Sequence, residues 1–267
     1  MKLKIFLILI LLFISSCDKP TEPNKTDFTN FRYPLEVGNK WAYQVSDVFT
    51  NIRSNTDNVE LPIFNGKYFV SVLQYDLGVY DYGLNEPGAF FVQSRLDRYD
   101  ADTLLHTYSR SGYFCNTNDG LFNFGGTLVG DFSLSQIYHN EEFHTKLRKN
   151  NASVWFNIFQ NMEYPIILGK TWKYSDTSFA LDNVEKKISD YKWITTQGGN
   201  QYCFVITSNY LDQPNYKIYD YYSEIGLVKK RIIALDINIY DENFDVIGLM
   251  DLERIYTLSS FTQSKGK

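Results

Sequence analysis

The sequence has few of the residues that usually build catalytic or metal centres. It contains three cysteines and three histidines in 267 residues, and neither a paired zinc-binding cysteine motif nor a G-x-S-x-G nucleophile motif occurs. If Lys2 and Lys4 near the N-terminus are left out, the chain has 24 basic and 31 acidic residues and a formal charge of −7. An acidic chain repels phosphate backbones, so we expect no nucleic acid partner. These absences favour a non-catalytic protein with no cofactor.

A long transmembrane run is also missing. The apolar run Ile5 to Ile14 has ten residues, and a helix of that length rises only ~15 Å, about half of the hydrocarbon thickness of a bilayer. Two lysines precede the run and Ser15 and Ser16 follow it. This order is typical of a secretory signal, so residues 1–16 are predicted to be a signal peptide.

The tetrad Ile14-Ser15-Ser16-Cys17 resembles the bacterial lipobox. That resemblance implies cleavage before Cys17 and lipidation of its sulfur with diacylglycerol and usually a third acyl chain. Two or three chains hold a protein on a bilayer where one would not. We therefore expect a membrane-anchored lipoprotein of the bacterial cell envelope. The alternative is an ordinary signal peptide that happens to contain a cysteine.

The residue after the cysteine, Asp18, resembles an inner-membrane retention signal of some Gram-negative bacteria, but that rule does not transfer between groups. The outer membrane is favoured and the inner membrane stays open. Residues 17–30 are rich in Pro, Thr, Asn and charge, a composition that cannot bury enough surface to fold. They are predicted to be a lipidated flexible tether, and the folded body is expected to begin near Phe31.

An internal repeat is the most informative feature of the body. YPLEVGNKWAY at 33–43 aligns without a gap to YPIILGKTWKY at 164–174. The identical pairs are Tyr33 and Tyr164, Pro34 and Pro165, Gly38 and Gly169, Trp41 and Trp172, and Tyr43 and Tyr174. A repeat of this kind predicts two related β modules, at 31–150 and 151–262, which are either separate or share one continuous sheet.

Each copy of the motif is expected to open a strand. Proline suits a strand start, and glycine permits the turn before it. The aliphatic pairs at 35 and 37 and at 166 and 168 are predicted to plug one face. The Trp and Tyr of each copy are two residues apart and so share a face. They form either a ligand platform or the core plug of each module, and the core plug is favoured.

The motif also resembles a segment of a widespread set of uncharacterised Gram-negative envelope lipoproteins, with the pattern Tyr-Pro-Leu-x-x-Gly-Asn-x-Trp-x-Tyr. Two further segments are similar to that group: GLFNFGGTLVGDF at 120–132, although Phe132 stands where Trp is common, and YYSEIGLVKKRI at 221–232. The resemblance implies a β-rich envelope protein and supplies no established activity.

The composition and pattern predict an all-β fold of antiparallel sheets, curved or closed into half-barrels, with few helices. The chain has 21 Tyr and 20 Phe, which favour pleated surfaces. Strand-like runs lie at 67–76, 89–100, 201–211, 216–223 and 227–240. In the last run, Ile233, Leu235, Ile237 and Ile239 are expected to face the core, with 246–258 as the antiparallel partner. Residues 147–162 alone hint at a helix.

Several motifs are weak candidates for chemistry. LGKTW at 168–172 ends like a phosphate-binding loop, but Tyr164 occupies the position of its first glycine. His139 and His144 are spaced five apart and would not converge on one metal ion. Asp97, Asp100 and Asp102 lack the central glycine of a calcium loop. No metal site is predicted from them.

Cys115 and Cys203 could form a disulfide in an exported protein, although Cys203 lies in an apolar run where a buried thiol packs well. The sequence leaves that pairing open.

We therefore expect a lipid-anchored, non-catalytic binding or structural module whose ligand is an envelope protein, a glycan or a lipid. Two alternatives remain: a carrier or chaperone of a lipid or lipoprotein in an apolar β cleft, and a hydrolase of envelope polymers.

Overall fold

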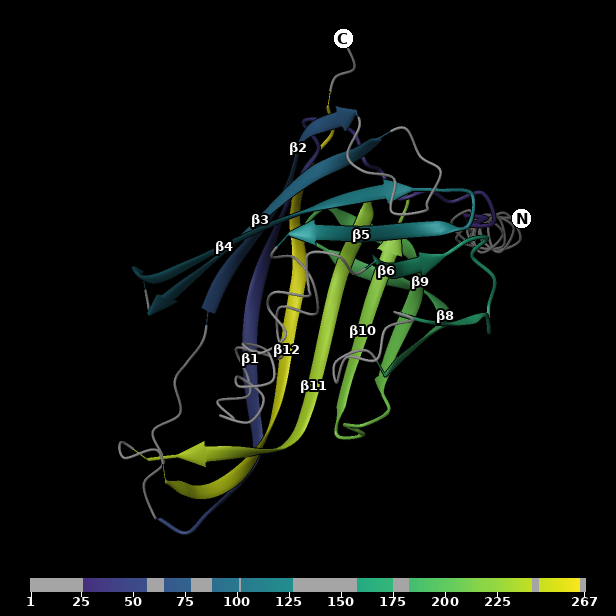
Figure 1. Cartoon of the computed structure of the whole chain (residues 1–267). Coiled ribbons are helices and arrows are strands. Elements are labelled where there is room, and N and C mark those ends of the chain that lie inside the picture. Colours follow the sequence, from purple (N-terminus) through teal and green to yellow (C-terminus); the bar gives the residue numbers. More distant parts are fainter. Residues whose placement is uncertain are drawn as a thin grey trace, which may run out of the picture.

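The computed structural model describes residues 26–56, 65–77, 88–100, 102–126, 158–174, 183–241 and 245–264. Over these ranges the chain forms twelve β-strands and no helix, and all strands belong to one antiparallel sheet (Figure 1). The expected all-β antiparallel class is confirmed. The strands are β1 Lys40–Ser54, β2 Asn65–Leu77, β3 Gly88–Asp100, β4 Thr103–Asn116, β5 Gly120–Gly126, β6 Ile158–Glu163, β7 Thr171–Lys173, β8 Val184–Thr196, β9 Gly199–Tyr210, β10 Tyr216–Ser223, β11 Gly226–Tyr240 and β12 Val246–Thr262.

The first and last strands lie together at the centre of the sheet. The spatial order is β6-β5-β4-β3-β2-β1-β12-β11-β10-β9-β8-β7, so the chain moves outward along one arm and returns along the other (Figure 1). β1 and β12 are joined by an ion pair between Asp47 and Arg254, with two bonds of 2.7 Å and both side chains buried. Burial lowers the pKa of Arg254, but the hydrogen bonds and charges of Asp47 and Tyr256 together outweigh burial and raise that pKa above its ordinary value.

The two edges of the sheet meet, so the sheet is nearly closed. The Gln160 N–H of β6 donates to the Tyr174 carbonyl, at the end of β7, over 2.8 Å. The Trp172 indole N–H of β7 donates to the Gln160 carbonyl over 3.0 Å. One curled, continuous sheet therefore contains both copies of the motif. β6 lies after residue 150 in sequence but pairs with β5 in the first arm.

The strands predicted from sequence correspond closely to β2, β3, β9, β10, β11 and β12, and β11 pairs with β12 as expected. The predicted alternation in β11 is wrong for part of its length. Ala234 is buried and Leu235 is exposed, because a register shift between Ala234 and Ile237, with Asp236 at φ +56°, changes the phase of the strand. Ile237 and Ile239 then face inward as predicted.

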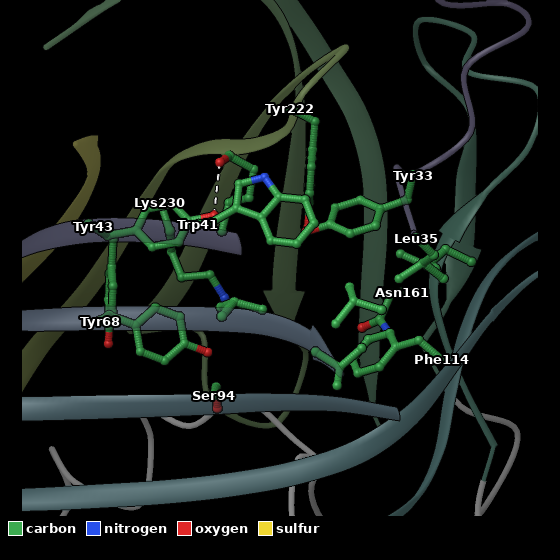
Figure 2. Close-up of a pocket in the computed structure, with 16 residues that line it drawn as sticks. Tyr33, Leu35, Trp41, Tyr43, Tyr68, Ser94, Phe114, Asn161, Tyr222 and Lys230 are labelled. Atoms are coloured by element: carbon green, nitrogen blue, oxygen red, sulfur yellow. Dashed lines mark hydrogen bonds between the residues drawn. The ribbon is translucent and has the colours of Figure 1, made fainter. Parts of the chain in front are cut away.

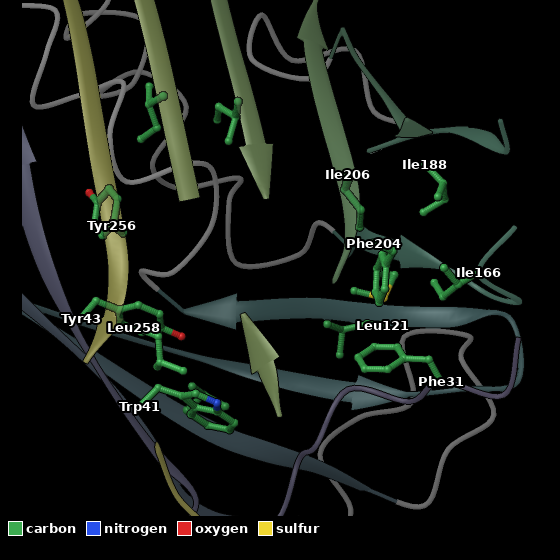
Figure 3. Packing of buried hydrophobic residues seen from close by; sticks show 14 of the residues in the cluster. Phe31, Trp41, Tyr43, Leu121, Ile166, Ile188, Phe204, Ile206, Tyr256 and Leu258 are labelled. Carbon is green, nitrogen blue, oxygen red and sulfur yellow. The ribbon is translucent and has the colours of Figure 1, made fainter. Parts of the chain in front are cut away.

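The main hydrophobic core fills the inside of the curled sheet (Figure 3). It includes Phe28, whose ring centroid lies 5.0 Å from that of Phe204 and which is only 3% exposed. The folded body therefore begins earlier than the expected Phe31, because an aromatic within the predicted tether is part of the core. Of the helix suggested at 147–162, residues 158–162 belong to strand β6, and the rest lies outside the described residues.

The two described cysteines lie in separate clusters. Cys115 packs in a small cluster with Ala89 and Phe124, whereas Cys203 packs with Val205 in another. Burial raises the pKa of the Cys203 thiol to about 12. The structure therefore contains no bridge between them.

Candidate functional site

The two copies of the motif form equivalent turns at their glycines. Gly38 has φ +98° and Gly169 has φ +87°, a region that L side chains rarely adopt. The Gly38 N–H donates to the Val72 carbonyl and the Gly169 N–H donates to the Ile188 carbonyl, both over 2.8 Å. In return, the Val72 N–H donates to Asn39 and the Ile188 N–H to Lys170. Each turn is thus fastened to the next strand, β2 or β8, by an equivalent pair of bonds.

The predicted plug of two aliphatic residues is half wrong in both copies. Leu35 and Ile166 are buried, but Val37 is 44% exposed and Leu168 is 57% exposed. The chain turns at the following glycine, so the residue before it points away from the core. Only the first aliphatic residue of each pair therefore contributes to the core.

The two copies also contact each other. The Tyr33 N–H donates to the Tyr164 hydroxyl over 3.0 Å, and that hydroxyl donates to Asn116 Oδ1 over 2.7 Å. Asn116 Nδ2 completes the ring by donating to the Tyr33 carbonyl over 2.7 Å. Burial is the main cause that raises the pKa of Tyr164 to about 12. This neutral network joins the starts of the two repeats.

A cavity of about 160 Å³ lies against the first copy of the motif (Figure 2). Its walls are mainly aromatic and aliphatic, with three polar residues among them. The lining residues are Tyr33, Leu35, Trp41, Tyr43, Tyr68, Val70, Val72, Val92, Ser94, Phe114, Leu121, Asn161, Tyr222, Leu227, Lys230 and Tyr256. They come from β1, β2, β3, β4, β5, β6, β10, β11 and β12 and from the segment before β1.

Backbone carbonyls of the β10–β11 turn and of the start of β11 hold the two β1 aromatics in place. The Trp41 indole N–H donates to the Ile225 carbonyl over 2.6 Å, and the Tyr43 hydroxyl donates to the Leu227 carbonyl over 3.0 Å. Gly226 has φ +97°, and a Cβ there would lie 3.1 Å from Trp41 Nε1. The glycine is therefore needed both for the turn and for the close approach of the indole.

The polar groups of the cavity differ in how well they are satisfied. Lys230 Nζ lies 3.4 Å from Asp220 Oδ1, and the Asp220 side chain is 7% exposed. Asn161 Nδ2 donates to Asn123 Oδ1 over 2.7 Å. Ser94 is 2% exposed, and its buried hydroxyl has no hydrogen-bond partner among the described residues. Ser94 is thus the unsatisfied polar group of this wall.

The second copy of the motif does not line this cavity. Trp172 belongs to the main core, and Tyr174 packs with Phe159 and Val184 in a separate cluster. The core-plug interpretation describes the second copy, whereas Trp41 and Tyr43 are both buried and cavity-lining.

The other motifs considered from sequence have structural partners or lie elsewhere. Lys170 of LGKTW donates to the Tyr164 carbonyl and pairs with Glu163. Asp97 accepts from Thr107 and pairs with Arg95. Cys17, His139 and His144 lie outside the described residues. Within the described ranges no group of three or more His, Cys, Asp or Glu side chains could hold a metal ion, and no helix is long and apolar enough to cross a membrane.

Sequence reasoning missed Ser94, Asn161 and Lys230 as cavity residues. Ser94 and Lys230 lie in ordinary strand-like runs and Asn161 lies in the segment that hinted at a helix. Only the curl of the sheet brings β3, β6 and β11 around one space. The resembling segments at 33–43, 120–132 and 221–232 were the available signal, since each supplies lining residues.

No protein-family model matches the chain, and no curated protein matches it. Among solved structures, the chain is similar to a Bacteroides fragilis protein described as exported and YmcC-like in fold, with 13% identity, coverage of 87% of this chain and 99% of that one, and a TM-score of 0.39. A Parabacteroides distasonis protein described as a lipoprotein matches with 14% identity, coverage of 89% and 100%, and a TM-score of 0.33. A Vibrio parahaemolyticus domain described as an outer membrane lipoprotein-sorting protein domain matches with 7% identity, coverage of 86% and 87%, and a TM-score of 0.20.

Proposed function

We propose that this protein is a lipoprotein of the bacterial cell envelope, anchored in a membrane through acyl chains on Cys17, and that its curled sheet is a non-catalytic binding module. The leader and lipobox support the anchor. The observation that supports binding is the convergence of three segments, within 33–43, 120–132 and 221–232, on one cavity. These are the same segments that resemble the envelope lipoproteins.

The cavity is a better match to a small ligand than to a whole lipid. Pockets for drug-sized ligands have volumes of ~300–1,000 Å³, whereas this cavity has about 160 Å³. A carrier of a complete lipid would need more enclosed space than this cavity provides. We therefore favour a binding module for a small compound over a lipid carrier.

A hydrolase of envelope polymers is supported less well. Glycoside hydrolysis ordinarily requires two carboxylates facing each other across the substrate. The lining residues include no Asp or Glu, and Lys230 is the one charged residue among them. The lining therefore suits recognition by shape and hydrogen bonding.

The anchor is tested by growing the native host with radiolabelled palmitate. We expect label in the wild-type protein and none in Cys17→Ala, with a mature N-terminus at residue 17. Label retained in Cys17→Ala, or an unlabelled wild type, would contradict the anchor.

Binding is tested separately on the acylated protein purified in detergent. Native mass spectrometry is expected to reveal a small compound bound to the wild type, and a Trp41→Phe variant should lose it. A wild type that carries no compound from the envelope extract, or a Trp41→Phe variant that retains it, would contradict a ligand site at this cavity.

A further inference from the structure

A row of aromatic side chains leads from the core to the surface close to the start of the described chain. The ring centroid of Phe28 lies 6.0 Å from that of Tyr191 and 5.9 Å from that of Tyr202, and both contacts are stacked. Trp193 lies beyond them, with its ring centroid 5.1 Å from that of Tyr202. Phe28 is 3% exposed whereas Trp193 is 38% exposed. The row therefore ends in a half-exposed indole.

The turn of the second motif copy adds two exposed aliphatic residues at the same place. Ile167 is 51% exposed and Leu168 is 57% exposed. The Tyr191 hydroxyl donates to the Ile166 carbonyl over 3.2 Å, so this turn is fastened beside the aromatic row. We call the exposed side chains of Ile167, Leu168 and Trp193 the apolar patch.

The charged side chains next to the apolar patch form ion pairs. Lys192 Nζ lies 3.3 Å from Asp190 Oδ2, and Lys170 Nζ lies 3.0 Å from Glu163 Oε1. Each pair is neutral, so neither one attracts an anionic surface over a distance. A partner of the apolar patch is therefore selected by its apolar surface more than by its charge.

The proposed lipid anchor brings this part of the body close to a bilayer. Cys17 lies nine residues before Thr26, the first described residue, and nine extended residues span at most ~30 Å. That reach is shorter than the ~55 Å length of the 17-residue strand β12. Figure 1 shows the start of the described chain on the side of the sheet where β8 and β9 lie, in agreement with the contacts of Phe28. Surfaces beside Phe28 therefore meet the bilayer more readily than those at the far end of the sheet.

The chemistry of the apolar patch suits the membrane–water interface. Tryptophan and tyrosine are enriched there, because the ring packs among apolar groups while the N–H or hydroxyl stays wet. Exposed aliphatic side chains gain free energy when they leave water. We propose that the apolar patch rests in the interface of the same membrane that holds the acyl chains on Cys17. The inference depends on the proposed anchor and adds a second contact between the body and the bilayer.

The contact is tested with the acylated protein in phosphatidylcholine vesicles whose acyl chains are brominated, since bromine quenches indoles that reach the lipid. The chain has four tryptophans, so the Trp193 signal is taken as the difference between the wild type and Trp193→Phe. This signal should be quenched about twofold relative to ordinary vesicles. Trp172→Phe is the buried control, because Trp172 is only 7% exposed, and it should keep the quenching of the wild type.

The outcomes separate this contact from the anchor. A protein without acyl chains would overturn the anchor and the contact together. An acylated, vesicle-bound protein whose Trp193 signal is unquenched would overturn the contact alone, and that is also the result expected if a second copy of the chain covered the apolar patch. Quenching that appears only in anionic phosphatidylglycerol vesicles would overturn an apolar contact.

Variants of the turn test whether the patch acts as a unit. The double variant Ile167→Ser and Leu168→Ser should lower the quenching of Trp193 about threefold, because two aliphatic groups no longer favour the interface. Leu211→Ser is the matched control: Leu211 is also 57% exposed but follows the other end of β9 from Tyr202. Unchanged urea unfolding verifies that the double variant is folded. Full quenching in the double variant, or an equal loss in Leu211→Ser, would overturn the proposal.

Discussion

The two copies of the motif form equivalent glycine turns but have different surroundings. Their glycines adopt similar φ angles and form equivalent bonds to the next strand. The first copy leads into β1, which is 15 residues long and paired on both sides, whereas the second leads into β7, which has three residues. The motif therefore determines the turn, and the neighbouring strands determine the role of its aromatics.

The surroundings explain why only one copy forms a cavity wall. Trp41 extends to the β10–β11 turn, where Gly226 leaves room for its indole. Trp172 instead donates to Gln160 across the seam between β6 and β7. The same residue type closes the sheet in one arm and lines a cavity in the other.

The largest difference between the copies is expected for the tryptophans. Trp41→Ala should lower the free energy of unfolding by ~3–5 kcal/mol, since it removes a buried indole and its hydrogen bond. Trp172→Ala should cost less, because β7 is a short edge strand and Trp172 is slightly more exposed. Urea unfolding measures both, with the 38% exposed Trp193 as the control for a surface tryptophan. A larger loss for Trp172 than for Trp41 would contradict the account.

The next largest loss of stability is expected when the hydrogen-bond network between the two copies is broken. Tyr164→Phe leaves the Tyr33 N–H and the Asn116 side chain without their shared partner, at a cost of ~1–3 kcal/mol. The substitution should also change how the free energy of unfolding depends on pH. The pKa of Tyr164 is raised to about 12, so its contribution is complete below pH ~10 and is lost as pH rises towards 12.

This pH dependence is measured as the difference between wild type and Tyr164→Phe, which cancels the titration of lysines. The stability advantage of the wild type should shrink between pH 10 and about 12. An advantage that grows over this range would show that the ionised form, not the neutral one, is bound in the fold.

The glycines give a smaller effect. Alanine at either position is strained by the positive φ, at a cost of ~1–2 kcal/mol. Gly38→Ala should cost more than Gly169→Ala, since a Cβ at 38 would lie 3.2 Å from Ser264 Oγ and a Cβ at 169 would meet nothing within 4 Å. Thermal unfolding of the two variants provides the comparison, and a reversed order would show that the C-terminal contact is unimportant.

The smallest effect is expected at the exposed aliphatic of each turn. Val37→Ser and Leu168→Ser should each change stability by less than ~0.5 kcal/mol, whereas Leu35→Ala and Ile166→Ala should each cost ~2–5 kcal/mol. Denaturant unfolding of the four variants compares the positions directly. A large loss at 37 or 168 would restore the two-residue plug expected from the sequence.

Much of the fold follows from local pattern, because aromatic and β-branched runs mark strands and Gly-containing turns separate them. The turn of each motif could be predicted for the same reason. The exposure of Val37 and Leu168 could not be predicted, because the alternation of inward and outward side chains along a strand ends at a turn. The burial of Phe28 depends on contacts with Phe204, far along the chain. Composition alone could not reveal that contact.

The candidate site was predictable only in part. Trp41 and Tyr43 could be named from the repeat. Whether they line a cavity or only fill the core depends on neighbouring strands whose positions the sequence does not predict. Ser94 and Lys230 lie on β3 and β11 and line the same cavity only because the sheet curls. The phase change at Asp236 likewise arises from pairing with β12.

The central claim is that the first copy of the motif, and not the second, lines a ligand cavity. It is tested most directly by following the indole N–H signals of Trp41 and Trp172 by nuclear magnetic resonance while phenol is added to the protein. Phenol is a single-ring probe that fits a cavity of about 160 Å³. The signals are assigned with single Trp→Phe variants. We predict a saturable shift of the Trp41 signal and no shift of the Trp172 signal. An unmoved Trp41 signal, or equal shifts of both, would contradict the claim.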